Sequence, residues 1–313
     1  MRLTEAFDGL ANRRVILFGG KGGVGKTTIS SLAALHFAQT RKVILFTTDP
    51  ASNLGDLFSA HRQPPTANPQ PTTHNLVIEA LDARALYARF LGENLEKLLE
   101  IGDRGTYFDR EELRRFFELS LPGVDEIMAW MRIGELAEEH PDALVVVDTA
   151  PTGHALRMLG AAEHFRQFAS ALEAMQEKHR AMVRQMTRRD VRDAVDEFIE
   201  GFEDKVRRGR ELLTDRGRAG LVPVLLSEPW VVEQTLRLMA EVREDGIDVP
   251  FAILNRAVMD VDCARCEKRR AADEAARSRL APLKVVAAPR SCVPIDTVDA
   301  LRQYISAGPG AAC

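Results

Sequence analysis

Cysteine is scarce in this chain and absent from most of it. None occurs in the first 262 of the 313 residues, and the four present are Cys263, Cys266, Cys292 and Cys313. So few thiols cannot form the disulfide framework of a small secreted scaffold. A chain of this length can bury enough apolar surface to fold without such cross-links.

Long apolar runs and a strong charge of either sign are also missing. No apolar run approaches the roughly 20 residues that a membrane-spanning helix needs. The first residues, MRLTEAFDGLANRR, lack the apolar segment of a secretory signal. The formal net charge of -4 gives no reason to expect a nucleic-acid-binding protein. We therefore expect a soluble, cytoplasmic protein.

Short apolar runs rich in Val, Ile and Leu recur along the chain and are separated by helical patterns. They lie at 15–18, 43–47, 143–147, 221–226, 251–255 and 284–288. Each run is continuously apolar, which is typical of parallel strands covered on both faces. Their alternation with helices predicts an α/β fold with a doubly wound, mostly parallel sheet.

Two stretches interrupt this rhythm with helical patterns alone, at 81–140 and 155–218. We expect them to form one helical insertion subdomain within a single domain that spans 1–313. In the second stretch Met175, Met182 and Met186 follow helical spacing. Such methionines suit an adaptable apolar groove, but a stripe of this kind is more often the core of a helix pair.

Residues 20–27 match the phosphate-loop pattern G-x-x-x-x-G-K-T, directly after an expected strand and before a helical pattern. Backbone N–H groups of such a loop bind phosphates together with the helix N-terminus. We expect Lys26 to bridge the β- and γ-phosphates of ATP, and the Thr27 hydroxyl to coordinate Mg²⁺. The expected nucleotide-binding residues of the loop are Gly20, Lys21, Gly22, Gly23, Val24, Gly25, Lys26, Thr27 and Thr28.

Two acidic residues directly follow expected strands, at the carboxyl ends where the phosphate loop is also expected. Asp148 comes after the run 143–147 and could hold Mg²⁺ through water. Asp49 comes after the run 43–47 and could orient the attacking water. A second lysine in the loop, Lys21, has no evident role toward its own phosphates.

Several segments resemble the signatures of one ATPase family, which includes the arsenical pump-driving ATPase and the tail-anchored-protein targeting ATPases. They are KGGVGKTT, TTDPASNLGDLF, DTAPTGHALRML and LNRAVMDVDCARCEKR, and the resemblance runs through nearly the whole chain. It implies a P-loop ATPase that hydrolyses ATP to ADP and phosphate as a homodimer. It also implies that Lys21 reaches the phosphates bound by the partner subunit.

The resemblance assigns further roles around the nucleotide. It implies that Asp49 activates water with Asn53 nearby, that residues 148–157 sense the γ-phosphate, and that Asn255 contacts adenine. Where the family often has P-L-x-x-E, this chain has PRSCVPIDTVDALR. The adenine contacts beyond Asn255 are therefore open.

The pair Cys263 and Cys266 has the spacing of half a tetrahedral Cys₄ zinc site. Two copies related by a two-fold axis would complete such a site. The targeting ATPases carry a similar pair and share one Zn²⁺ between subunits, so the resemblance implies zinc at a dimer interface. We expect the pair at a helix start with Asp262 as the N-cap. A redox dithiol, or two cysteines without a special role, are the alternatives.

The resemblance leaves the cargo open between several classes. The targeting ATPases bind a hydrophobic client helix in a composite groove, and a membrane receptor would be a further partner. Arsenite or antimonite is disfavoured because 81–218 contains no cysteine to bind it. A partner-binding switch of the cell-division or plasmid-partition type and an iron–sulfur electron-transfer ATPase are the alternatives from other classes.

Overall fold

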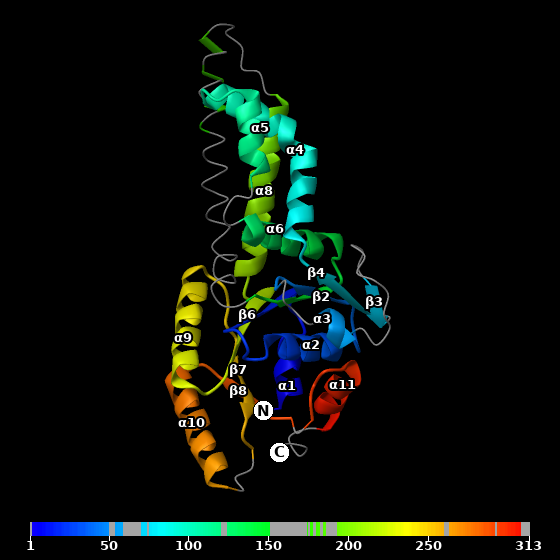
Figure 1. Ribbon diagram of the computed structural model, residues 1–313, viewed down its shortest axis with the longest axis vertical. Helices are drawn as coiled ribbons and strands as arrows, with labels where there is room; N and C mark the ends of the chain where they lie inside the picture. Colours follow the sequence, from blue (N-terminus) through cyan, green and yellow to red (C-terminus); the bar gives the residue numbers. More distant parts are fainter. Residues whose placement is uncertain are drawn as a thin grey trace. The chain divides into compact units, whose positions relative to one another are not determined.

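The computed structural model describes residues 2–49, 54–58, 70–73, 75–119, 124–150, seven positions between 174 and 185, 193–259, 263–291 and 293–307. The chain divides into two compact units (Figure 1). The first, here the sheet unit, comprises 1–81, 136–156 and 212–313. The second, the helical unit, comprises 82–135 and 157–211.

The sheet unit is built on one eight-stranded sheet in the order β3-β4-β2-β5-β1-β6-β7-β8. All neighbouring pairs are parallel except β3 and β4, which are antiparallel. The strands are β1 (Val15–Gly19), β2 (Val43–Thr47), β3 (Gln70–Thr73), β4 (Leu76–Ala80), β5 (Leu144–Asp148), β6 (Ala219–Leu225), β7 (Ala252–Ala257) and β8 (Val285–Pro289).

The central strands are continuously apolar because helices cover both faces of the sheet. Every residue of β1, β2, β5 and β6 is buried. The connection from β1 to β2 and the connection from β6 to β7 run in opposite directions along the sheet. Since such crossovers are right-handed, their helices must lie on opposite faces.

The helices follow this rule (Figure 1). On one face α2 (Lys26–Phe37) packs against β1, β2 and β5, with α1 (Leu3–Asp8) and α11 (Val298–Ala307) beside it. Toward the other face α9 (Pro229–Glu244) packs on β6, and α10 (Ala264–Leu280) packs on α9 and β7. A short helix, α3 (Leu54–Phe58), follows β2. The predicted doubly wound, mostly parallel α/β fold with a helical insertion is therefore confirmed.

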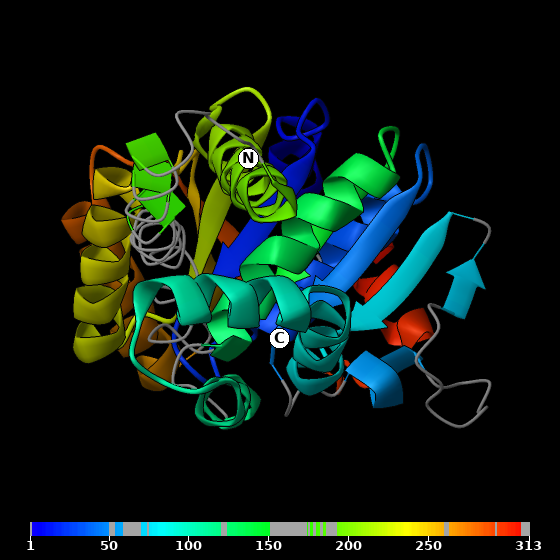
Figure 2. The ribbon, with the colours of Figure 1, turned by 90° about the horizontal axis from the view of Figure 1, so that it is seen from above.

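Strands β3 and β4 were not predicted. They lie at one edge of the sheet (Figure 2). In β4 only Leu76 is buried, and the following residues are half-buried or exposed. The apolar run of β4, from Leu76 to Ile78, ends at Glu79 and is shorter than the runs of the inner strands. Strand β3 lies beyond β4 and forms the edge itself.

The helical unit contains α4 (Ala83–Gly105), α5 (Arg110–Glu118), most of α6 (Val124–Glu139) and most of α8 (Ala194–Thr214). Asp82 caps α4 by accepting from the Ala85 N–H at 2.9 Å, and Asp109 forms a capping box with Glu112 at the start of α5. In α8 the side chains of Val195, Phe202 and Val206 are buried. Met175, Met182 and Met186 lie outside the described residues.

Apolar contacts between α4, α5 and α8 form the core of this unit. One cluster joins Leu98 and Leu99 of α4 to Leu113 and Phe117 of α5, with Phe198 of α8 packed against it. A second cluster is formed by Ile101, Val195 and Ile199. Within the described part of the chain, no helix is long and apolar enough to cross a membrane.

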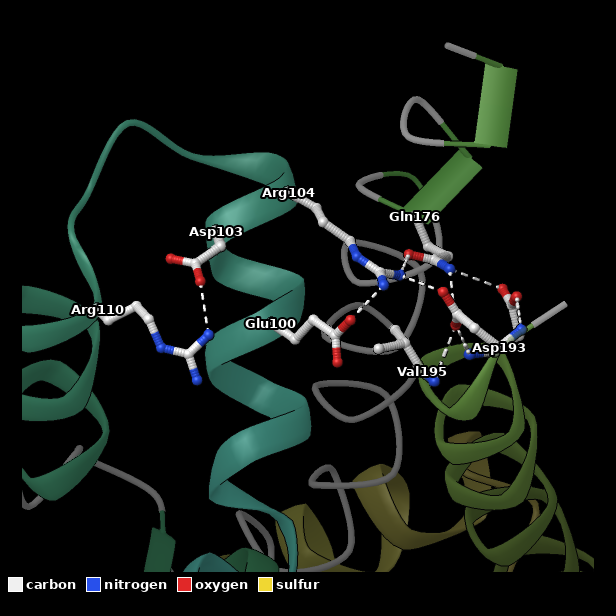
Figure 3. Close-up of polar contacts among 8 residues, drawn as sticks. Glu100, Asp103, Arg104, Arg110, Gln176, Asp193 and Val195 are labelled. Atoms are coloured by element: carbon white, nitrogen blue, oxygen red, sulfur yellow. Dashed lines mark hydrogen bonds and ion pairs between the residues drawn. The ribbon is translucent and has the colours of Figure 1, made fainter. Parts of the chain in front are cut away.

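A partly buried polar network joins α4 to the start of α8 (Figure 3). Arg104 lies 2.8 Å from Asp193 and donates to Gln176 at 2.7 Å, and it also pairs with Glu100. Asp193 caps α8 by accepting from the backbone N–H of Val195 at 3.0 Å. Burial alone would raise the pKa of Asp193, but the backbone N–H of Asp196 and the Arg104 guanidinium outweigh it and lower that pKa.

Candidate functional site

The phosphate loop joins β1 to α2, and the end of β6 and Asn255 hold it in position. Gly25 has a φ of 93°, and a Cβ there would lie 2.3 Å from Asn255 Nδ2. That same amide nitrogen donates to the Val24 carbonyl oxygen at 2.8 Å. A Cβ on Gly20 would lie 2.2 Å from the Val224 carbonyl oxygen, so β6 closes the other side. Asn255 thus braces the loop from β7.

Lys26 belongs to the phosphate loop and is the first residue of α2. Its side chain is buried, and its Nζ donates to the Lys21 carbonyl oxygen at 3.1 Å. Burial lowers the pKa of Lys26, while the negative charges of Asp148 and Asp49 oppose that shift. An ammonium group in this position is poorly hydrated, and phosphate oxygens would supply the negative charge and the hydrogen bonds it lacks.

Thr27 and Asp148 meet where β1 and β5 end. The Thr27 hydroxyl donates to Asp148 Oδ2 at 2.8 Å, and Asp148 is almost fully buried. Thr47, at the end of β2, donates to the same oxygen at 3.4 Å and is buried as well. Hydroxyl and carboxylate oxygens side by side at a helix N-terminus suit Mg²⁺ with its preference for oxygen ligands. The donor set therefore fits the predicted metal.

Asp49 lies just beyond β2. Its backbone N–H donates to Thr47 Oγ1 at 3.2 Å, and its charge acts on Lys26. The structure thus brings Lys26, Thr27, Asp49 and Asp148 together at the carboxyl ends of the central strands. Asn53 and the positions 151–157 of the predicted γ-phosphate sensor lie outside the described residues. Thr47 was not predicted, although the TTDP sequence places it at a strand end.

A pocket of about 370 Å³ adjoins the loop. It is lined by Gly25 and Thr28 of the loop, by Asn255 of β7, and by Pro289 and Tyr304 from later elements. The Tyr304 hydroxyl donates to the Pro289 carbonyl oxygen at 2.7 Å, and burial raises the pKa of Tyr304. The volume is within the range of small-molecule sites. A nucleoside beyond the phosphates would enter this pocket, whose walls include the segment that the sequence left open.

The side chain of Lys21 contacts an aromatic ring. Its Nζ lies 3.0 Å from the ring centroid of Trp230, the second residue of α9. Trp230 was not predicted to take part in the site. Nothing in the local sequence could indicate the contact, because 209 positions separate the two residues along the chain.

The cysteine pair begins α10. Cys263 is the N-cap, so the expectation of Asp262 as the cap is wrong. The two sulfur atoms are 3.3 Å apart, and Cys263 is exposed. The Cys266 backbone N–H, then the Cys266 side chain, lower the pKa of Cys263. Two thiolates about 2.3 Å from a tetrahedral Zn²⁺ would stand about 3.8 Å apart. Within the described ranges, no group of three or more ligand side chains is assembled for a metal.

A phosphate loop between the first strand of a parallel sheet and a helix, with a threonine–aspartate pair beside it, defines a P-loop nucleoside triphosphatase. Residues 13–289 match the family of anion-transporting ATPases, and the chain belongs to this family. It is an ATPase, as the sequence motifs predicted.

Relatives in this family extend over most of the chain. ATPase ASNA1 homolog 1 of Paramecium tetraurelia is 30% identical over 275 residues, which are 81% of this chain and 78% of that protein. ATPase GET3A of Arabidopsis thaliana is 28% identical over 254 residues, covering 78% and 67%. The "Putative arsenical pump-driving ATPase 2" of Aquifex aeolicus is 28% identical over 248 residues, covering 78% and 80%.

Proposed function

We propose that this ATPase works as a magnesium-dependent homodimer whose nucleotide state controls the capture and release of a hydrophobic client. The client class we favour is a tail-anchored or other membrane protein segment. The observation that carries the ATPase part is the assembly of Lys26, Thr27 and Asp148 around a braced phosphate loop. The other parts rest on Lys21, on the cysteine pair and on the helical unit.

At the nucleotide, Lys26 binds the β- and γ-phosphates, and the loop N–H groups and the start of α2 hold the remaining oxygens. Thr27 and Asp148 hold Mg²⁺, which neutralises charge on the phosphate oxygens when bound. Asp49 orients the attacking water and accepts its proton. Asn255 keeps the loop in shape and contributes to the nucleoside pocket.

Lys21 completes the site of a partner subunit. Its Nζ lies over the Trp230 ring, while Lys26 is the lysine buried within the loop. This difference supports a role for Lys21 outside its own site. A cation that arrives only when two subunits close would neutralise transition-state charge in the manner of an arginine finger. Hydrolysis would then require dimer closure.

The cysteine pair joins the two subunits through one Zn²⁺. The sulfur spacing of 3.3 Å is within about half an ångström of the tetrahedral value. One chain offers two thiols, so a closed Cys₄ site needs a second copy. Metal analysis should find one zinc for every two chains, and a Cys263→Ser/Cys266→Ser variant should contain none. Iron and a brown colour would instead indicate the iron–sulfur alternative.

The client part rests on the helical unit. A pocket of about 210 Å³ there is lined by the apolar side chains of Phe90, Met128, Met131, Phe198 and Phe202, with charged residues among its other walls. This volume is below the roughly 300 Å³ at which small-molecule sites begin, so it suits one anchoring side chain of a larger ligand. A helix long enough to cross a membrane would need surface from two subunits.

The client and the metalloid alternatives can be separated with purified protein. We expect a peptide with an apolar 20-residue helix to stimulate ATP hydrolysis, whereas arsenite and antimonite leave the rate unchanged. The absence of cysteine from 81–218 supports this ranking. Stimulation by metalloid together with indifference to the peptide would reverse it. For a partner-binding switch of the partition type, neither addition would change the rate.

A further inference from the structure

Trp230 occupies an unusual position for a large apolar side chain. It is 52% exposed, whereas the next two residues of α9, Val231 and Val232, are buried against the sheet. It lies in the first turn of the helix, directly after Pro229. The packing of α9 against the sheet does not require an indole at position 230, because the buried face of the helix begins one residue later.

The surrounding elements fix Trp230 next to the phosphate loop. Helix α9 packs closely on the end of β1, since a Cβ on Gly19 would lie 3.3 Å from a methyl group of Leu238. The end of β6 touches the loop itself at Gly20. The first turn of α9, which follows β6, is therefore held at the loop, and the Lys21 ammonium rests 3.0 Å from the centroid of the Trp230 ring.

We propose that Trp230 is a positioning residue that holds Lys21 in a resting place until a partner subunit with bound nucleotide closes on it. The indole face is the strongest of the aromatic binding surfaces for a cation. While the ammonium lies on it, the same group cannot neutralise phosphate charge elsewhere. Closure of two subunits must therefore exchange the indole contact for the partner's phosphate oxygens. This inference rests on the proposed in-trans role of Lys21.

The contact is suited to release as well as to binding. A cation–π contact at an exposed site is weak, and the positive end of the α9 dipole lies close by and opposes the ammonium. A contact of this size shifts an equilibrium about two- to five-fold. That is small beside the attraction of phosphate oxygens. The partner's nucleotide therefore displaces the lysine, while zinc-linked subunits without nucleotide favour the open arrangement.

The first test measures ATP hydrolysis as a function of protein concentration in the Cys263→Ser/Cys266→Ser background, where zinc no longer links the subunits and closure depends on concentration. In Trp230→Leu the competing contact is gone, and we expect half-maximal activity at about two- to five-fold lower concentration than with the wild-type Trp230. Trp230→Phe keeps an aromatic face and should lie close to the wild type. A residue that merely supplied apolar dimer contact would shift the Leu variant in the opposite direction. An unchanged or increased half-maximal concentration in Trp230→Leu overturns the proposal.

The second test uses the emission of Trp230. The chain has two tryptophans, and the other, Trp130, is buried in the helical unit, so Trp130→Phe leaves Trp230 as the sole reporter. In this background, adding Lys21→Met should change the emission of the nucleotide-free protein. A non-hydrolysable ATP analogue with Mg²⁺ should change the Lys21 protein toward the Met spectrum. Identical spectra with lysine and methionine would refute the contact.

The two proposals fail in different ways. Normal ATP hydrolysis by Lys21→Met would remove the in-trans role, and with it the purpose of the resting place. A Lys21→Met protein that is inactive, combined with a Trp230→Leu protein that matches the wild type, would leave the in-trans role intact and remove only the function of Trp230.

Discussion

The brace between Gly25 and Asn255 makes a quantitative prediction. Replacing Gly25 with alanine puts a Cβ 2.3 Å from Asn255 Nδ2 at a φ of 93°. The left-handed backbone costs about 1–2 kcal/mol for a residue with a Cβ. Displacing the amide also breaks its hydrogen bond to the Val24 carbonyl oxygen, which adds about 0.5–1.5 kcal/mol. We expect a total loss of about 1.5–3.5 kcal/mol.

Gly23 provides the matched control within the same loop. Its φ is also positive, at 79°, but a Cβ there would meet nothing within 4 Å. Gly23→Ala should therefore show the backbone contribution alone. Urea unfolding followed by circular dichroism, without nucleotide, measures the free energy of unfolding for both variants. Titration with MgATP then shows whether the loss of affinity is larger for Gly25→Ala.

A double-mutant cycle isolates the clash. In an Asn255→Ala background the amide is gone, and the destabilisation by Gly25→Ala should fall to that of Gly23→Ala. The expected coupling energy between positions 25 and 255 is about 0.5–1.5 kcal/mol. If Gly25→Ala and Gly23→Ala destabilise equally, and Asn255→Ala leaves the difference at zero, the claim that Asn255 braces the loop is wrong.

Three further predictions concern the metal ligands and the polar network of the helical unit. Thr27→Val should lower the rate of Mg²⁺-dependent ATP hydrolysis by about 100-fold or more, as expected when a transition-state contact is lost. Thr27→Ser keeps the hydroxyl and should retain most of the activity in a steady-state assay. Arg104→Met leaves the Asp193 carboxylate without its guanidinium and should destabilise the helical unit by about 1.5–3 kcal/mol in urea titrations. Destabilisation below about 0.5 kcal/mol, the size expected of an exposed ion pair, would contradict a structural role for the Arg104 network. Because the pKa of Asp193 is lowered, its contribution to stability is present above the ordinary carboxyl pKa of about 4 and is lost as the pH falls through the lowered value. Thermal unfolding measured from about pH 6 to about pH 2 covers this range. The melting temperature should show this loss of stability in the wild type and a smaller loss in Asp193→Asn.

The sequence alone predicted the inner strands of the sheet and the chemistry at their carboxyl ends. Strands such as β1 and β5 are covered on both faces, so their burial appears as unbroken apolar runs. The glycine spacing of the loop and the acids after the strands are local patterns, and they name the residue types that phosphate and magnesium require. Strands β3 and β4 were not predicted, because the apolar run of β4 is short, from Leu76 to Ile78, and the sequence of β3, QPTT, contains none.

Tertiary structure alone decided which distant side chains meet. The Asn255 brace, the Thr47 contact with Asp148 and the resting place of Lys21 on Trp230 each join residues far apart along the chain. No periodicity or spacing encodes such pairs. They arise because the carboxyl ends of parallel strands lie side by side, and the first turns of the helices that follow these strands lie at the same end.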